Sequence, residues 1–446
     1  MSKMKSLLAG AGIVALIGGE ASAAGWLTNG MTQAGQSPYT NGIPLTGNEL
    51  APFDTQLSGG AMPQTEAVSI GQLANYNGSL ASKNNGIIAG DASTNLWQRG
   101  TSGTSSTSAT VQWSSADHWG QWATASAGVK IVKDTTAADL PAGYSAAYAL
   151  THTATTAGQI CMGQPLETVD SLQFAGQTAE LDFHAATGSG YTGGATFTAY
   201  IVTGTGTDDG LNKMAYTVNA GGATGWTGGA NATAAVVPLS AVSTSGRFAA
   251  VAKIPAGTTE IGVAFCYTTT TADTNDQVAI TGIQLVRNAA LTSVANATAA
   301  LPSTTAQLTS FQRRLASEDQ LRQYRYYYQV NEFDTVGVVQ SPGGYYVDTT
   351  HCQIAFSLPA PMFKAPTIQN SAITNATFKV SPGSVTPVAL AGSGNSGLIL
   401  AVGSSPSAPF TVGVGSFITT TETIENSCVL VSTAAGAGNF GFTAED

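Results

Sequence analysis

Hydrophobic and polar positions alternate in short runs along the middle of the chain, with the two-residue period of a β-strand. The clearest runs are TSATVQW (107–113), TAELDFHA (178–185), EIGVAFCYT (260–268) and QVAITGIQLV (277–286), and residues typical of turns separate them. Many short strands with frequent turn signals are typical of a β-sandwich. We therefore predict a sandwich over residues 86–290.

One run departs from simple alternation. In ATFTAYIVTG (195–204), Tyr200 and Val202 share one strand face while Phe197 falls on the other. Apolar residues on both faces indicate a strand buried on both sides, or a bulge. The flanking stretches GTGTDDG (204–210) and GGATGWTGG (221–229) are predicted to be turns or loops.

A connection and one helix are predicted over residues 291–330. The helix signal is a capping box, with Ser317 as the N-cap and Gln320 three residues later. One apolar helix face is then expected to consist of Leu321, Tyr324 and Tyr328. The β pattern returns over residues 331–446, which predicts a second, smaller β-domain.

The first 85 residues show neither the two-residue period of a strand nor the 3.6-residue period of a helix. Residues 1–24 contain Lys3 and Lys5, an apolar run and a small-residue Ala-Ser-Ala site, which is the pattern of a secretory signal. An uncleaved apolar anchor that docks into a larger assembly is the alternative. Residues 25–85 are rich in Gly, Asn, Pro and Gln, so we expect an extended segment that orders only by packing against neighbouring copies.

Composition supports a mainly β protein and excludes one class of ligand. The 446 residues include 52 glycines, and only 9% of residues are charged. The net charge of −10 leaves no basic patch, so a nucleic-acid backbone would be repelled. Nucleic acid is therefore not expected among the partners.

Four cysteines lie far apart, at Cys161, Cys266, Cys352 and Cys428. Without closely spaced pairs they do not form a zinc motif. Buried free thiols are one interpretation. Pairing of Cys161 with Cys266 and of Cys352 with Cys428 is the other, if the environment is oxidising.

The stretch NLWQRGTSGTSSTSATVQWSSADHWG (95–120) carries a resemblance to a known family. It is similar to a module of bacteriophage tail-fibre and other virion proteins that reads W-Q-R-G-T-S, a polar strand, then Y-x-A-D-R-W. Residues Trp97 to Ser102 match the first motif, and Ala116, Asp117 and Trp119 match the second. His118 stands where the family has arginine, and Gly90-Asp91-Ala92 is a degraded form of its N-G-D-F.

Further matches preserve the order and spacing of this family over residues 44–370. The T-G-x-E-L-x-P-x-D-T pattern of virion N-termini matches from Thr46 to Thr55. Asp182-Phe183-His184-Ala185 replaces the family's F-W-A-K. Other similar segments are Gly163–Glu167, Asp276–Leu285, Phe311–Arg314, Leu321–Gln329 and SLPAPMFKAPTIQ at 357–369.

The resemblance implies a jelly-roll β-sandwich, similar to carbohydrate-binding modules, on a trimeric fibre, spike or adhesin of a virion. It also implies attachment to other virion proteins through residues 25–85 and binding of a host surface polysaccharide. A capsid decoration or vertex protein without glycan binding is one alternative. A secreted bacterial carbohydrate-binding protein is the other, because of the signal-like N-terminus.

The tryptophans are the candidate ligand-binding residues. Trp122 and Trp226 are flanked by small and polar residues, so we predict that they form an exposed platform for sugar. Trp97 and Trp119 are predicted to be part of the structural frame, together with an ion pair between Arg99 and Asp117 that ties the two ends of the 95–120 stretch. Trp113, in a good strand pattern, is expected in the core.

No catalytic or metal site is predicted, and the protein is expected not to be an enzyme. The four histidines (118, 152, 184 and 351) have no partners at ligand spacing. Glu180 and Asp182 share a strand face and could form a glycosidase pair, but we expect solvated surface residues. Asp208-Asp209, and Asp273 with Asp276, are turn residues that could bind Ca²⁺; no cofactor is otherwise expected.

Overall fold

The computed structural model divides the chain into two compact units, Met1–Leu80 and Ala81–Asp446. The boundaries predicted within the second unit stay predictions. The structure describes residues 50–55, 64–69, 85–93, 96–103, 105–107, 109–124, 126–136, 138–188, 191, 196–219, 225–239, 245–269, 276–288, 291, 300–302, 308–330, 344–346, 351–364, 367–369, 378–382, 388–389, 398–401, 411–417, 427–432 and 440–445.

The first unit contains a strand pair where the sequence predicted only extended chain. Strand β1 (Leu50–Thr55) runs antiparallel to β2 (Gln64–Ser69), in continuous register from Leu50 opposite Ser69 to Thr55 opposite Gln64. A two-stranded hairpin is marginal in water by itself, and the prediction that this segment orders by packing against neighbouring copies stays a prediction. The predicted signal or anchor at 1–24 lies outside the described residues.

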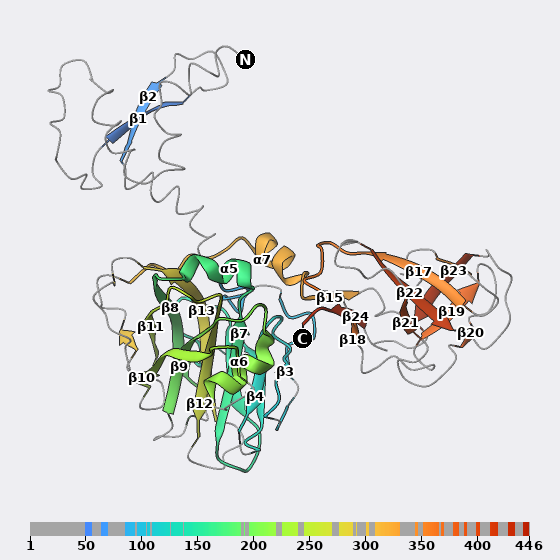
Figure 1. The fold of residues 1–446 in the computed structure, drawn as a ribbon, viewed down its shortest axis with the longest axis horizontal. Coiled ribbons are helices and arrows are strands. Elements are labelled where there is room, and N and C mark those ends of the chain that lie inside the picture. Colours follow the sequence, from blue (N-terminus) through green and yellow to red (C-terminus); the bar gives the residue numbers. More distant parts are fainter. Residues whose placement is uncertain are drawn as a thin grey trace. The chain divides into compact units, whose positions relative to one another are not determined.

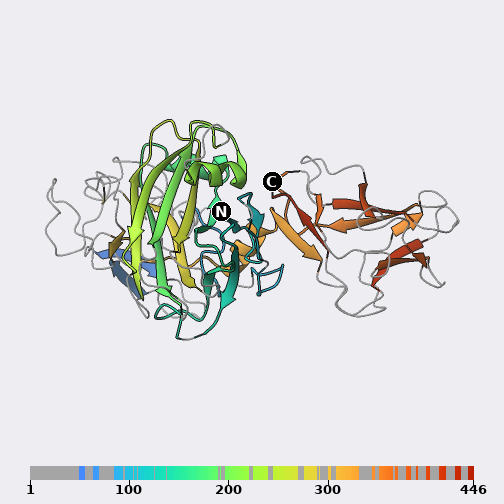
Figure 2. The same ribbon diagram turned by 90° about the horizontal axis from the view of Figure 1, so that it is seen from below.

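The second unit contains a sandwich of two six-stranded antiparallel sheets, which Figures 1 and 2 show from two directions. This confirms the predicted fold class. The first sheet has the order β10 (Ala230–Val237), β9 (Thr196–Gly204), β12 (Glu260–Thr268), β7 (Gln159–Pro165), β4 (Gly120–Ala123) and β3 (Gln112–Trp113). The second has the order β14 (Leu301–Pro302), β11 (Ser245–Lys253), β8 (Thr178–Thr187), β13 (Gln277–Arg287), β6 (Ala147–His152) and β5 (Val129–Asp134).

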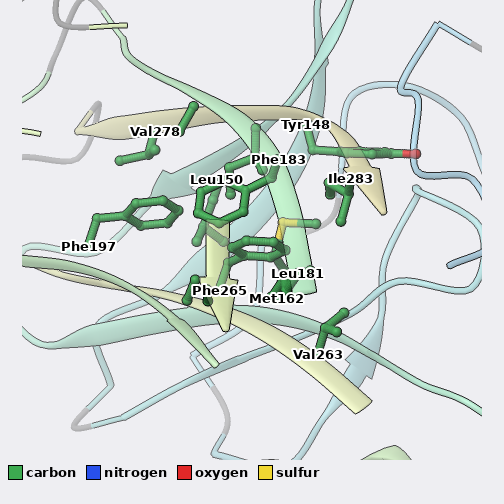
Figure 3. Close-up of a cluster of buried hydrophobic side chains, with 14 of the residues drawn as sticks. Tyr148, Leu150, Met162, Leu181, Phe183, Phe197, Val263, Phe265, Val278 and Ile283 are labelled. Atoms are coloured by element: carbon green, nitrogen blue, oxygen red, sulfur yellow. The ribbon is translucent and has the colours of Figure 1, made fainter. Parts of the chain in front are cut away.

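The main core lies between these sheets (Figure 3). Alternate residues of β8, including Leu181 and Phe183, meet alternate residues of β12, including Phe265. The rings of Phe183 and Phe265 pack edge to face with centroids 4.9 Å apart, a favoured geometry for aromatic pairs. Phe197 of β9 joins the same cluster, as its place opposite Tyr200 and Val202 predicted.

The outer face of the first sheet is also buried, because helix α6 (Gly210–Val218) lies against it (Figure 1). This helix was not predicted: the sequence reads as a turn before it and a loop after it. Its buried residues recur at helical spacing and pack on Trp122 and the outward side chains of β7, β9 and β12; they are Leu211, Met214, Ala215 and Val218. Helix α5 (Thr168–Ser171) is a single turn after β7.

The outer face of the second sheet is covered by residues 308–312, so the expectation of a solvated Glu180 and Asp182 is wrong. Both carboxylates are fully buried. Asp182 forms a two-oxygen ion pair with Arg247 of β11, and Glu180 accepts the Thr309 N–H at 3.0 Å. Thr309 of the connection donates to Glu180, while Arg247 and Gln284 donate to Asp182, which is why the two acids can leave water.

Helix α7 (Ala316–Gln323) occupies the predicted place, but its first residue and its buried face differ from the prediction. Leu315 is the N-cap, so Ser317 lies inside the helix and makes no cap hydrogen bond. Leu321 is exposed, whereas Asp319 and Gln323 are buried, and Tyr328 lies in the following strand β15 (Tyr327–Val330). None of the described helices has the length and apolar character needed to cross a membrane.

A second group of strands follows, as the sequence predicted. A three-stranded sheet has the order β15, β24 (Phe440–Thr443) and β18 (Thr367–Gln369). A seven-stranded sheet has the order β20 (Val388–Ala389), β19 (Phe378–Pro382), β23 (Ser427–Ser432), β16 (Gly344–Tyr346), β17 (His351–Ser357), β22 (Thr411–Phe417) and β21 (Leu398–Ala401).

The structure distinguishes between free thiols and a disulfide for the first cysteine pair. Cys161 of β7 and Cys266 of β12 are directly opposite in the register and form a disulfide under α6. Cys428 is also disulfide-bonded. The side chain of Cys352 lies outside the described residues, so its predicted pairing with Cys428 stays a prediction.

Candidate functional site

An open cleft in the second unit is the candidate site. Its walls are the turn between β3 and β4, the end of β7, the loop between β9 and α6, the start of β12, and short segments after β17 and β24. The lining falls into two groups, aromatic rings and carboxylates. Clefts that combine flat apolar surface with a few polar groups are the usual form of a small-ligand site.

The aromatic group forms a continuous array along the cleft. The ring of His118 stacks on Tyr326 with centroids 3.8 Å apart and on Trp113 at 6.0 Å, with the latter rings tilted by only 10°. Phe363 continues the array 5.5 Å from Tyr326. Trp226 also lines the cleft. His118, Tyr326 and Trp226 are buried, whereas Trp113 and Phe363 are partly exposed at the cleft. These two rings offer the C–H faces of a sugar a stacking surface.

His118 reaches this array through an unusual backbone conformation. Its φ of 62° lies in the left-handed region, which few residues other than glycine and asparagine adopt. The ring is buried, and burial followed by the charge of Arg99 lowers the pKa of His118 to about 3. The imidazole is therefore neutral at physiological pH. It donates to the Pro165 carbonyl, since proline has no N–H to give.

Arg99 and Asp117 form the predicted frame pair, with Nη1 and Oδ1 3.8 Å apart. Asp117 also accepts the backbone and side-chain N–H groups of Gln98 at 3.1 and 3.0 Å, which ties the two ends of the 95–120 stretch together. The sequence did not indicate the third member, Glu445 from the end of the chain, which pairs with Arg99. Arg99 lies 3.6 Å over the ring of Tyr327.

Five carboxylates form the second group of the lining: Glu167, Asp208, Asp209, Glu260 and Glu445. Burial raises the pKa of Glu167, of Glu260 and of Glu445, the last to about 7 although Arg99 opposes the shift. Arg325 pairs with Glu167, and Lys213 pairs with Asp209. The cleft is thus acidic and rich in hydrogen-bond acceptors.

The predicted exposed platform of Trp122 and Trp226 is wrong. Trp122 is 0% exposed because α6 covers it, and its ring lies in the cluster around the Cys161–Cys266 disulfide. Trp226 is 4% exposed, and its Nε1 donates to the Gly210 carbonyl at 2.8 Å. The two residues are not brought together as one surface, since only Trp226 lines the cleft.

Three other tryptophans lie in different surroundings, and Trp113 is the one that departs from the expectation. Trp97 and Trp119 are buried in the main core, where both contact Tyr148 with centroids 5.3 and 5.7 Å away. Trp113, expected in the core, is only partly buried and lines the cleft. A short edge strand of two residues explains this, because one side of its indole has no neighbouring strand to cover it.

The candidate calcium ligands have other partners. Asp208 accepts the Thr168 N–H at 2.7 Å, and Asp276 accepts the Tyr267 hydroxyl at 2.6 Å. Asp273 lies outside the described residues. In the described part of the chain no group of three His, Cys, Asp or Glu side chains is arranged to hold a metal ion.

No family model matches the chain, and no curated protein matches it by sequence. Several solved structures match. The enzymatically active domain of tailspike protein 4 of bacteriophage CBA120 is 13% identical with a TM-score of 0.25, covering 46% of this chain and 21% of that one. The carbohydrate-binding module TmCBM61, solved with β-1,4-galactotriose, is 14% identical with a TM-score of 0.22, covering 38% and 88%.

A third match corrects a prediction. The arabinose-bound α-L-arabinofuranosidase MgGH51 is 8% identical with a TM-score of 0.28, covering 46% of this chain and 27% of that one. Two of the three matches are therefore enzymes or enzymatic domains. This contradicts the expectation that the chain is not an enzyme, and we withdraw it.

Proposed function

We propose that the protein binds a glycan in the cleft lined by Trp113, His118 and Tyr326. The observation that carries the proposal is the pair of partly exposed rings, Trp113 and Phe363, at a cleft that is also lined by acceptor groups. Sugars bind through stacking on flat rings and through hydrogen bonds from fixed polar groups, and the cleft offers both.

The wider role in this proposal is that of a virion fibre, spike or adhesin that attaches to a host surface polysaccharide. The family resemblance supports it, because the cleft takes residues from four of the resembling segments, at 95–120, 163–167, 321–329 and 357–369. In the proposed assembly, residues 25–85 hold the copies together and to other virion proteins. Several weak sites on one particle would then act together through multivalency.

A printed array of bacterial and plant glycans, probed with the full chain, tests the proposal. Glycans that bind are then titrated by calorimetry against the wild type and Trp113→Ala. Because Trp113 contributes its ring face to the cleft, we expect Trp113→Ala to weaken binding by about tenfold or more. Release of reducing ends in the same samples measures turnover.

Tyr216→Ala is the matched control, since Tyr216 is an exposed aromatic residue of α6 outside the cleft. It should leave affinity unchanged. If no glycan binds the wild type, the structural virion component without a glycan site becomes the better account. Equal losses in the two variants would also contradict a site at Trp113.

A secreted carbohydrate-binding protein is the second candidate. The Cys161–Cys266 disulfide favours an oxidising environment, which fits both a secreted protein and a virion surface. N-terminal sequencing of the mature protein separates the two. A start near Ala24 indicates cleavage of a signal, and a start at Met1 or Ser2 indicates assembly without export.

A further inference from the structure

One end of the cleft carries negative charge that no cation in the described structure balances. Asp208, Asp209 and Glu260 lie close enough that both aspartates act electrostatically on Glu260. Lys213 pairs with Asp209, but no described ion pair includes Asp208 or Glu260. The adjoining loop that contains Trp226 has no charged residue between Lys213 and Arg247.

Glu260 is the key residue of this region, because it is buried and incompletely bonded. Its side chain belongs to a residue that is 1% exposed, and it lines the cleft. One carboxylate oxygen accepts the Asp209 N–H. The other, Oε2, makes no hydrogen bond of ordinary geometry and lies beside the backbone of Gly204 and Gly206. A buried carboxylate in this state gains free energy from any donor that reaches it.

His118 adds a second acceptor to the same cleft. Its Nδ1 is buried without a hydrogen-bond partner, while the other ring nitrogen donates to Pro165. The neutral imidazole therefore presents a lone pair at Nδ1. Both unsatisfied groups accept hydrogen bonds, so a complementary ligand must supply donors.

We infer that the glycan bound in this cleft is an amino sugar with a free amine, whose ammonium group lies against Glu260 and Asp208. The inference rests on the proposed glycan-binding function and specifies its ligand. An ammonium supplies both the donors and the positive charge that the acidic end lacks, and the aromatic array provides a face for the sugar ring. A uronic acid or a sulfated sugar would bring a further negative charge to unpaired carboxylates and is excluded from the same position.

An ammonium fits this end of the cleft better than a metal ion does. A divalent cation needs several oxygen ligands converging on one point. The described residues contain no such group, and Asp208 and Asp209 are turned toward the backbone N–H groups of Thr168 and Thr227. To bind an amine, by contrast, the Glu260 carboxylate with its Oε2 lacking a hydrogen bond of ordinary geometry is sufficient.

Calorimetry of the full chain with three soluble probes tests the inference. The probes are an oligomer of β-1,4-linked glucosamine, the same oligomer fully N-acetylated, and an oligogalacturonate, at about pH 6, where such an amine is charged. We expect the free-amine oligomer to bind about tenfold or more tightly than its acetylated form, and the oligogalacturonate not to bind. The preference should shrink as salt is added.

Three variants test whether the preference for the free amine comes from the acidic end of the cleft. Glu260→Gln keeps the shape of the side chain and should remove the preference, so that the free-amine and acetylated oligomers bind with about equal affinity. Asp208→Asn, at an exposed position that cannot disturb the core, should reduce it in part. Glu318→Gln on α7, outside the cleft, should leave it unchanged.

The outcomes separate this inference from the proposed function. Equal or tighter binding of the acetylated oligomer, with Trp113→Ala still weakening it, overturns the amino-sugar inference and leaves glycan binding standing. A preference for the free amine that survives in Glu260→Gln also overturns it. Failure of every saccharide in both this series and the array removes the proposed function, and the inference with it.

Discussion

Single residues in the cleft depart from ordinary preferences, and each departure has a physical reason. His118 accepts a left-handed backbone so that its ring can stack between Trp113 and Tyr326. The sequence showed only that histidine replaces the family's arginine at this position. Arginine at a buried site beside Arg99 would place two like charges together, whereas the neutral imidazole does not.

His118→Asn should reduce the pH dependence of stability. The unfolded chain binds a proton at His118 below about pH 6.5, whereas the folded protein does so only near pH 3, so His118 contributes stability above pH 6.5 that is lost as pH falls. Between pH 7 and pH 4 the wild type should lose about 3 kcal/mol more than the variant.

Urea unfolding at the two pH values measures this difference, and asparagine is chosen because it tolerates the left-handed conformation. The neighbouring carboxyl groups of Asp117 and Glu445 titrate in both proteins, so their contribution largely cancels. Parallel pH profiles would contradict a buried, neutral His118.

At the scale of elements, the sequence predicted the strands well because alternation is a local signal. TAELDFHA (178–185) and EIGVAFCYT (260–268) lie in β8 and β12. What covers their outer faces was not predicted, because it depends on contacts distant in sequence. The sequence suggested that Glu180 and Asp182 are solvated, but Thr309 donates to Glu180, and Gln284 donates to Asp182 and to the Thr309 carbonyl. The helical spacing of Leu211, Met214, Ala215 and Val218 was a usable signal for α6 that the glycine-rich flanks obscured.

The disulfide between β7 and β12 should contribute strongly to the stability of the sandwich. It closes a chain segment of 105 residues, and restricting an unfolded loop of that length is worth about 4 kcal/mol. We expect Cys161→Ala with Cys266→Ala to lower the free energy of unfolding by about that amount. Denaturant titration of the oxidised wild type and the double variant measures it.

Equal unfolding midpoints for the two proteins would contradict this contribution. Because both sulfur atoms are buried under α6, a mild reductant should also leave the native wild type intact until it unfolds. Rapid reduction of the folded protein would show that the helix does not protect the bond.

At the scale of the whole molecule, the cleft depends on residues from both ends of the second unit. Trp113 and His118 come from the start of the sandwich, Tyr326 and Phe363 follow it, and Glu445 is the penultimate residue. The sequence predicted an aromatic binding site but assigned it to Trp122 and Trp226. The residues that flank a tryptophan do not show whether it lies on an edge strand, where its side chain stays partly exposed. The ion pair of Arg99 with Asp117 was predictable from the motif, but its third member Glu445 was not.

The proposed assembly predicts an oligomer. In solution the full chain should have about three times the protomer mass of 45.1 kDa, because residues 25–85 are expected to pack between copies. Deletion of residues 1–85 should yield monomers. Light scattering coupled to gel filtration measures both. A monomeric full chain, or a trimer that survives the deletion, would contradict the role given to this segment.

The most direct test of the account is a crystal structure of the protein bound to an oligosaccharide that it recognises on the array. The account predicts that a sugar ring lies in the cleft, against the ring of Trp113, with a hydrogen-bond donor of the ligand facing Glu260. An oligosaccharide bound elsewhere on the sandwich, with the cleft unoccupied, would contradict it.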